Sequence, residues 1–477
     1  MTLSPNSLPP GLRRHGALTA LAVLLTAGAA DAQSGLLLGG KNQTPLAGSV
    51  RAGEVTPATL SLSFEEAIER GLRWNLGVVL SRETIRATDG QHQQALSSLL
   101  PHLALTTTLS VQQLNVRAQE GIGFPGLPAV IGPFANVDAR VRFTQSVFDR
   151  PAFLRVRAGG EEVQAARRSH QDVREQMVVA VGAAYLQTIA HTARAHSAQA
   201  QRDTAHALHE QAVDRLKAGT AAAIDVLRAD VQLKAREQQL IAARNDLAKQ
   251  KLALARLIGL PLGQGFTVAD EVLHPSVGAA TPDDALRRAY SARADHQTLQ
   301  AQVRALELRR KAASAETLPA LSLSLDYGAV GVTPASATGT VGGVAALTIP
   351  LFQGGRVRGE VAQADAALAQ GRAQLENLRG QIEQDVRSAL LDLDSAAEQV
   401  DVARRMVDLA AQTLQQARDR FTAGVTDNIE VVQAQEAVAS AAETLIVSEY
   451  LHNLAALGLA RAMGSAESGL PDLLQAR

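Results

Sequence analysis

Two short stretches of the chain place charged or amide side chains one to three helical turns before a glycine, either Gly219 or Gly424. Glu210 and Asp214 are four residues apart, so they share a helix face and repel each other mildly unless a cation lies opposite. We expect these carboxylates to pair with arginines of the second stretch, within or between chains. The alternative is that all of them form a solvated helix face. The residues concerned are Glu210, Asp214, Arg215, Gln415, Arg418 and Arg420.

Other patterns that could support chemistry are weak. His206, His209 and Glu210 have the spacing of one helix face, but no further compact ligand cluster accompanies them, which favours a solvated face over a metal site. The segment GIGFPG at 121–126 formally matches a dinucleotide-binding loop, yet it contains Pro125 and opens no helix. The sequence contains no nucleophile elbow, P-loop or acid–base pair that we can identify. It therefore predicts a protein that is not an enzyme and uses no cofactor or metal.

The composition favours long helices. The chain has 477 residues, 46% hydrophobic but only 3% aromatic, which is typical of helices packed through small side chains. Its formal net charge is -1 and no basic face is clustered, which argues against a nucleic-acid partner. There are no cysteines, so disulfides, thiolate metal sites and a lipidated N-terminal cysteine are excluded.

The first 32 residues have the pattern of a secretory signal peptide. Basic residues at 13–15 precede a short apolar run, and Ala30, Asp31 and Ala32 form a cleavage motif. A signal anchor is the alternative, but the run is short for a membrane span of about 20 residues. No later stretch is apolar for that length. If the protein enters a membrane after export, it must therefore do so without a transmembrane helix.

The chain is a duplication. RLKAGTAAAIDVLRAD at 215–230 recurs as RFTAGVTDNIEVVQAQ at 420–435, and other matches share offsets of 204 to 218 residues. The change of offset places an insertion of about 14 residues between Val116 and Asn136, where a Gly/Pro-rich loop is expected. The expected organisation is a signal peptide at 1–32, a linker at 33–59, a first repeat at 60–262, a linker at 263–280, a second repeat at 281–465 and a tail at 466–477.

Each repeat shows the same order of elements: one short amphipathic helix, two strands joined by a loop, a very long helix, a tight turn and a second helix. Apolar and polar residues alternate along the strands, as in strands that cross a bilayer with the apolar side outward. A soluble sheet with one wet face would alternate in the same way. The expected strands are 101–115, 136–148, 319–330 and 339–350, with Val137, Val141, Phe143 and Val147 on the apolar side of the second. The expected helices are 150–217, 224–258, 356–422 and 428–463.

Four strands cannot close a transmembrane barrel, since the smallest have about eight. A membrane location therefore requires an oligomer that shares one barrel. The fold class predicted is mainly helical, with long coiled-coil-like helices and a β-barrel portion completed by several chains.

The chain resembles the TolC-like outer-membrane efflux protein family. The resemblance rests on LSLSFEEAIERGLRWN at 60–75, on LP before two strands, on IPLFQGGR at 349–356 and above all on the paired turns. It implies a homotrimer in the lipid of the outer membrane, with a twelve-stranded barrel and a twelve-helix periplasmic tunnel. It also implies two partners, a periplasmic adaptor and an inner-membrane transporter.

Under this resemblance the paired turns are the tips at the periplasmic mouth of the tunnel, where an adaptor docks. Glycine suits the positive φ that ends a helix, and the isoleucine after each turn would pack the returning helix against the descending one. Turns duplicated only for folding are the alternative. Many relatives carry an acidic residue around the closed aperture where this chain has Gln415, whereas the matching position in the first repeat is Glu210. The resemblance therefore implies that the charged and amide residues before the two turns are the candidates for an aperture gate. The docking candidates are Gly219, Thr220, Ile224, Asp225, Gly424, Val425, Ile429 and Glu430.

The leading hypothesis is a passive exit duct for a tripartite efflux or type I secretion system, located in the cell outer membrane and extending into the periplasm. The competing hypothesis is a periplasmic coiled-coil protein that bridges membrane complexes. Such a bridging protein would not need two pairs of barrel-type strands.

Overall fold

The computed structural model describes residues 46, 48–115, 130–220, 222–270, 281–423, 425 and 428–469. The predicted signal peptide, most of the predicted inserted loop, Gly424 and residues 470–477 of the tail lie outside the described residues.

The two repeats have the same order of elements. The first contains β1 (Leu60–Leu62), α1 (Phe64–Trp74), α2 (Leu76–Ser97), β2 (His102–Asn115), β3 (Val130–Phe148), α4 (Arg150–Lys217) and α5 (Ala223–Leu257). The second contains β4 (Phe266–Val268), α6 (Pro282–Ala292), α7 (Ala294–Ala315), β5 (Ala320–Gly331), β6 (Thr338–Thr348), α8 (Arg356–Thr422) and α9 (Asn428–Ala462), with a 3₁₀ turn, η2 (Pro334–Ser336), between its longer strands.

Two helices, not one, precede the strands of each repeat. Asn75 makes the break in the first repeat: its backbone N–H donates to Gly71 O at 2.9 Å and ends α1. Its side-chain Oδ1 accepts from Gly77 N at 2.9 Å and starts α2. Ser63 and Glu66 form a capping box at the start of α1. The prediction of a single short helix was wrong because the chain turns at Asn75 and then resumes helical conformation.

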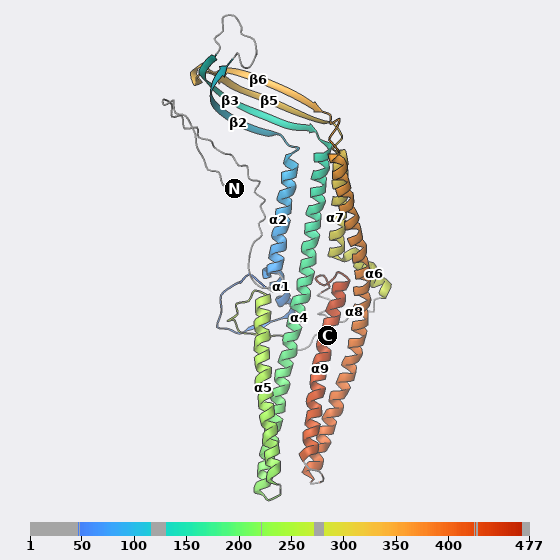
Figure 1. Ribbon diagram of the computed structural model, residues 1–477. Helices are drawn as coiled ribbons and strands as arrows, with labels where there is room; N and C mark the ends of the chain where they lie inside the picture. Colours follow the sequence, from blue (N-terminus) through green and yellow to red (C-terminus); the bar gives the residue numbers. More distant parts are fainter. Residues whose placement is uncertain are drawn as a thin grey trace, which may run out of the picture. The chain divides into compact units, whose positions relative to one another are not determined.

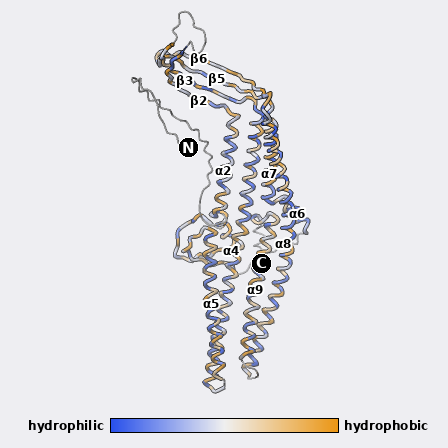
Figure 2. Tube along the Cα trace, in the orientation of Figure 1, coloured by the Kyte–Doolittle hydropathy of each residue, from blue (hydrophilic) through white to orange (hydrophobic). Residues whose placement is uncertain are grey.

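The four long strands form one antiparallel sheet in the order β2-β3-β5-β6 (Figure 1). Directly paired residues share a face, so Leu105, Val141, Tyr327 and Val341 form one apolar row across all four strands. The exposed fractions of Leu105, Tyr327 and Val341 are 73%, 69% and 82%. Hydrophobic and hydrophilic positions follow one another along these strands (Figure 2). The apolar face of the sheet is therefore uncovered in the single chain.

The strand bounds differ from the expectation in two places. β3 begins at Val130, not at 136, so part of the expected loop is strand. An irregularity between Ser146 and Phe148 then places Phe148 opposite Leu321, where the alternation had placed Val147. The stretch 263–280, expected to be only a linker, contains β4, which pairs in parallel with β1.

The main hydrophobic core lies where α1, α4, α5 and the β1–β4 pair meet. The hydroxyl of Tyr185 lies 2.8 Å from both Leu62 O and Asp270 Oδ2. Burial, followed by the hydrogen bond to Asp270, raises the pKa of Tyr185, so the side chain stays a neutral donor. The ring of Phe64 meets it edge to face at 5.5 Å. This core fixes the start of the first repeat against the middle of α4.

The long helices begin and end at identifiable residues. Asp149 caps α4 by accepting from Ala152 N at 2.9 Å, and Gly355, with φ +88°, precedes α8. With 68 and 67 residues, α4 and α8 would each extend roughly 100 Å. α5 packs along α4, and α9 along α8 (Figure 1). In the described part of the chain, every helix is too short or too polar to cross a membrane.

Candidate functional site

The first tip is a tight turn between α4 and α5. Gly219 has φ +73°, a conformation that costs most residues with a side chain about 1 kcal/mol or more. Thr220 donates through both its N–H (2.9 Å) and its Oγ1 (3.1 Å) to Arg215 O at the end of α4. Asp225 accepts from Ala222 N at 3.4 Å and so supports the start of α5. Thr220 therefore closes the descending helix, and Asp225 caps the returning one.

The second tip follows the same plan in its described residues. Ala423 N donates to Asp419 O at 2.9 Å, and Val425 N donates to Arg420 O at 3.0 Å, as Thr220 N does to Arg215 O. Val425 is exposed. Glu430, in the first turn of α9, lies 3.1 Å from Arg420 and joins α9 to the end of α8.

An apolar groove runs between the starts of α5 and α9. It has a volume of about 380 Å³. Leu227 and Val231 in its wall are 62% and 71% exposed. Ile224 and Ile429 also line it and are 50% and 42% exposed, so part of each side chain faces this shared groove. Their expected packing against the descending helices stays a prediction. Its lining is Ile224, Leu227, Arg228, Val231, Ile429, Val432 and Gln433.

The predicted charge pairing is absent within one chain. In the described residues, Glu210 lies 3.5 Å from His206 and Asp214 lies 3.1 Å from Lys217, each on its own helix. Neither carboxylate forms an ion pair with Arg418 or Arg420 in this part of the chain. Residues three or four apart on a helix are already within reach, so the local pairs form first. Pairing between chains stays a prediction.

Gln415 likewise bonds within its own helix, donating to Asp419 Oδ1 at 3.0 Å. Arg215, in contrast, does cross between the two repeats at this depth. Its guanidinium carbon lies 4.3 Å from the ring centre of Phe421, and Nη1 donates to Phe421 O at 3.4 Å. The contact joins the end of α4 to the end of α8, so it holds the two tips together through a cation–π interaction.

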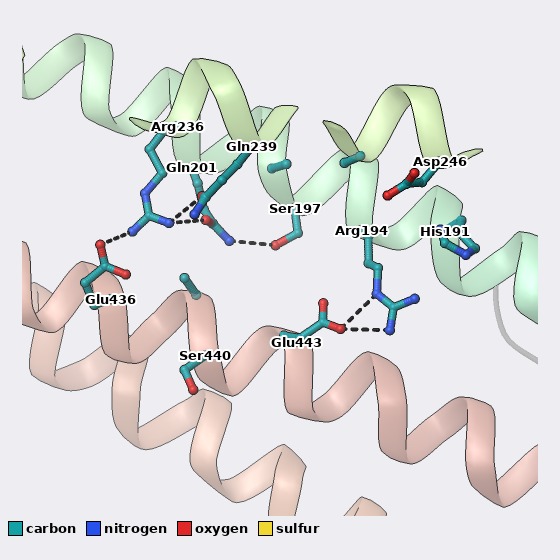
Figure 3. Close-up of a pocket in the computed structure, with 13 residues that line it drawn as sticks. His191, Arg194, Ser197, Gln201, Arg236, Gln239, Asp246, Glu436, Ser440 and Glu443 are labelled. Atoms are coloured by element: carbon teal, nitrogen blue, oxygen red, sulfur yellow. Dashed lines mark hydrogen bonds and ion pairs between the residues drawn. The ribbon is translucent and has the colours of Figure 1, made fainter. Parts of the chain in front are cut away.

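A polar cavity of about 520 Å³ lies between α4, α5 and α9 (Figure 3). Two ion pairs cross it from the first repeat to α9. Arg194 Nε donates to Glu443 at 2.8 Å, and the buried Arg236 pairs with Glu436. Glu436 and Glu443 are seven residues apart, so they lie on the same face of α9. The two pairs therefore connect α9 to both helices of the first hairpin.

Further hydrogen bonds fix Arg236 in this cavity. Its Nη1 donates to Gln201 at 3.2 Å and to Gln239 at 2.7 Å, and Gln232 donates to Glu436 at 2.7 Å. The buried guanidinium is therefore compensated by a carboxylate and by amide oxygens. The bonds to Gln201, Gln239 and Glu436 are drawn in Figure 3.

At the other end of the cavity, burial and, after it, the positive charge of Arg194 lower the pKa of His191. Asp246 opposes this effect. His191 is thus held neutral in a cavity that already contains two arginines. In the described residues, no three His, Asp or Glu side chains are grouped so as to hold a metal ion.

Several of these residues were not among the candidates. The groove residues could have been found from the apolar spacing of Ile224, Leu227 and Val231, which is that of one helix face beside a turn. Phe421 and the arginines of the cavity carry no such local signal. Their contacts join residues about 200 or more apart in sequence, so they depend on how the repeats pack.

The sequence and the fold were compared with those of known proteins. The sequence model of a family described as "Outer membrane efflux protein" matches residues 80–260 and again 285–465. No curated protein matches the chain. Solved structures of outer-membrane channels share its fold of duplicated long helices and strands. The chain belongs to the outer membrane efflux protein family.

Three solved structures illustrate the shared fold. The outer membrane protein VceC from Vibrio cholerae is 19% identical, with a TM-score of 0.71 over 84% of this chain and 96% of VceC. A membrane protein from Pseudomonas aeruginosa is 18% identical, with a TM-score of 0.74 over 89% of this chain and 98% of its own. The open state of the MtrE outer membrane channel of Neisseria gonorrhoeae is 16% identical, with a TM-score of 0.72 over 87% and 94%.

Proposed function

We propose that this protein is the outer-membrane exit duct of a tripartite efflux or type I secretion system, which passively conducts substrates across the periplasm and outer membrane. The observation that carries the proposal is the sheet. Its apolar face extends across four strands without a cover in the single chain, while the opposite face carries hydroxyls and charges. A lipid-facing wall with a wet lumen behind it needs both faces. Family membership supports the same location.

The edges of the sheet support a homotrimer. β2 and β6 are its two edge strands, and the alternating directions of the four strands make them antiparallel to each other. β6 of one chain can therefore pair with β2 of the next and continue the ladder. Exposed leucines or isoleucines also lie along α5 and α8, at Ile241 and Leu252 and at Leu391 and Leu409. Three chains would close a barrel of twelve strands and a tunnel of twelve helices.

The tips are the proposed docking site for a periplasmic adaptor. The groove between α5 and α9 is apolar in its walls and has Arg228 at its edge, which suits a helical hairpin with apolar and acidic residues near its turn. The transporter of the inner membrane supplies the energy, and the tips pass on its substrate. A periplasmic bridging protein, the competing hypothesis, gains nothing from an exposed apolar sheet face.

Fractionation tests the proposal. The protein, expressed with its N-terminal segment, should sediment with the outer membrane on a density gradient. It should also migrate differently on gels with and without boiling, as folded barrels do. Recovery in the soluble periplasmic fraction with no heat-dependent migration would support the bridging protein instead.

A further inference from the structure

All charged side chains of the four long strands lie close together on one face of the sheet. β2 and β6 contain no Asp, Glu, Lys or Arg, β5 contains only Asp326, and β3 contains the other three. In the strand register they occupy three consecutive rows of the polar face. The charged residues are Asp138, Arg140, Arg142 and Asp326.

Arg140 is held by both carboxylates. Its Nε donates to Asp138 at 2.8 Å, and Nη1 lies 3.4 Å from Asp326 on the neighbouring strand. Gly328 stands directly opposite Arg140, and a Cβ there would come within 2.5 Å of both Ala139 O and the Cβ of Arg140. A side chain at 328 would therefore displace Arg140 together with the backbone of β3. The glycine leaves the space in which Arg140 spans the two strands.

Arg142 is different. It is exposed and lies directly opposite Asp326, but in the described residues no hydrogen bond or ion pair of its guanidinium occurs. The neighbouring positions on this face are small, such as Thr106, Ser324 and Gly342. The arginines are thus the longest side chains of the face, and Arg142 has no partner among the described residues.

We propose that these four residues form a charge-balanced belt on the lumen wall, at which Arg142 meets the anionic groups of transported molecules. The inference rests on the proposed function, because this face lines a lumen only in a closed barrel. Two positive and two negative charges per chain cancel, so the belt opposes neither sign strongly. Loss of Arg142 leaves an excess of one negative charge per chain, and loss of the Asp326 charge leaves an excess of one positive charge.

A single introduced thiol can report the potential at this belt, because the chain has no cysteine. Ser324→Cys lies on the same face, one row from Arg142 and Asp326. In outer-membrane vesicles we would measure its rates of reaction with an anionic and a cationic methanethiosulfonate, and take the ratio of the two rates. Adding Arg142→Gln should lower the anionic-to-cationic ratio by about fivefold, as expected for one charge removed at this separation in salt solution.

Two matched variants complete the test. Asp326→Asn should raise the ratio by a similar factor, and Arg142→Gln with Asp326→Asn should return it to the starting value because the charges balance again. If the ratio is unchanged in both single variants, the proposed charge belt is contradicted. Leu103→Cys, on the apolar face, should stay unreactive in the same vesicles. If it reacts as fast as Ser324→Cys, the polar face does not line a closed lumen, and the proposed function and the belt are both contradicted.

Discussion

The sheet and the helix tips both expose large apolar side chains, but in different patterns. On the sheet, one unbroken row of large apolar residues, Leu105, Val141, Tyr327 and Val341, runs from β2 to β6, and in the described strands only the opposite face carries charge. At the tips, the exposed apolar residues line one groove with a polar or charged residue, Arg228 or Gln433, on each helix. A continuous apolar face suits a fluid apolar solvent, whereas a bounded groove suits a partner of defined shape. The difference supports the proposal that the sheet faces lipid and that the tips bind a protein partner.

The largest expected effect is on the apolar face of the sheet. Leu105→Arg should cost about 2 to 4 kcal/mol near the bilayer midplane and strongly reduce assembly in the outer membrane. Thr108→Arg is the matched control, because Thr108 lies on the polar face opposite Asp138. Assembly can be measured as the heat-modifiable fraction on gels. Equal assembly of the two variants would point to a soluble sheet.

The next effect separates docking from assembly. Leu227→Asp places a charge in the wall of the tip groove and should reduce export at least about tenfold, since an unpaired buried charge costs well over 1.4 kcal/mol. Assembly should be normal. Gln238→Asp adds the same charge at an exposed position of α5 outside the groove and should export normally. Normal export by Leu227→Asp would remove the groove from the mechanism.

A smaller effect concerns the contact that joins the tips. Phe421→Ala removes the ring beneath Arg215, a contact worth about 1 kcal/mol, so the resting conductance in planar bilayers should rise about fivefold. Phe421→Tyr keeps the ring and should conduct as the parent does. Glu210→Ala tests pairing between chains in the same assay. A conductance that rises with Glu210→Ala but not with Phe421→Ala would favour the charged gate over the aromatic contact.

The smallest effect is a pH dependence at the polar cavity. The folded protein lowers the pKa of His191, so the unfolded chain binds the proton more readily. The stability from neutral His191 is complete above its ordinary pKa of about 6.5 and is lost as the pH falls below it. Between pH 7.5 and 5.5, the Tm of the parent should fall by about 1 °C more than that of His191→Gln. Equal falls would show that His191 does not sense acid.

Features set by local sequence patterns could be predicted, whereas contacts between residues distant in the sequence could not. Alternation and uninterrupted helical pattern are local, so strands and long helices were found close to their observed positions, from Arg150 to Lys217 for α4. The break between α1 and α2 at Asn75 was missed because it depends on a single capping side chain. At the tips, Thr220 could be assigned to the turn from its local chemistry, whereas the capping role of Asp225 was not predicted. The contact of Arg215 with Phe421 could not, because it joins residues 206 apart.

The proposed function requires several chains to complete one barrel, since four strands leave two open edges in a single chain. Native mass spectrometry of protein extracted from outer membranes in mild detergent tests this directly. We expect a species of three chains that persists until heating. A stable monomer in the same detergent, still inserted into the membrane before extraction, would contradict it.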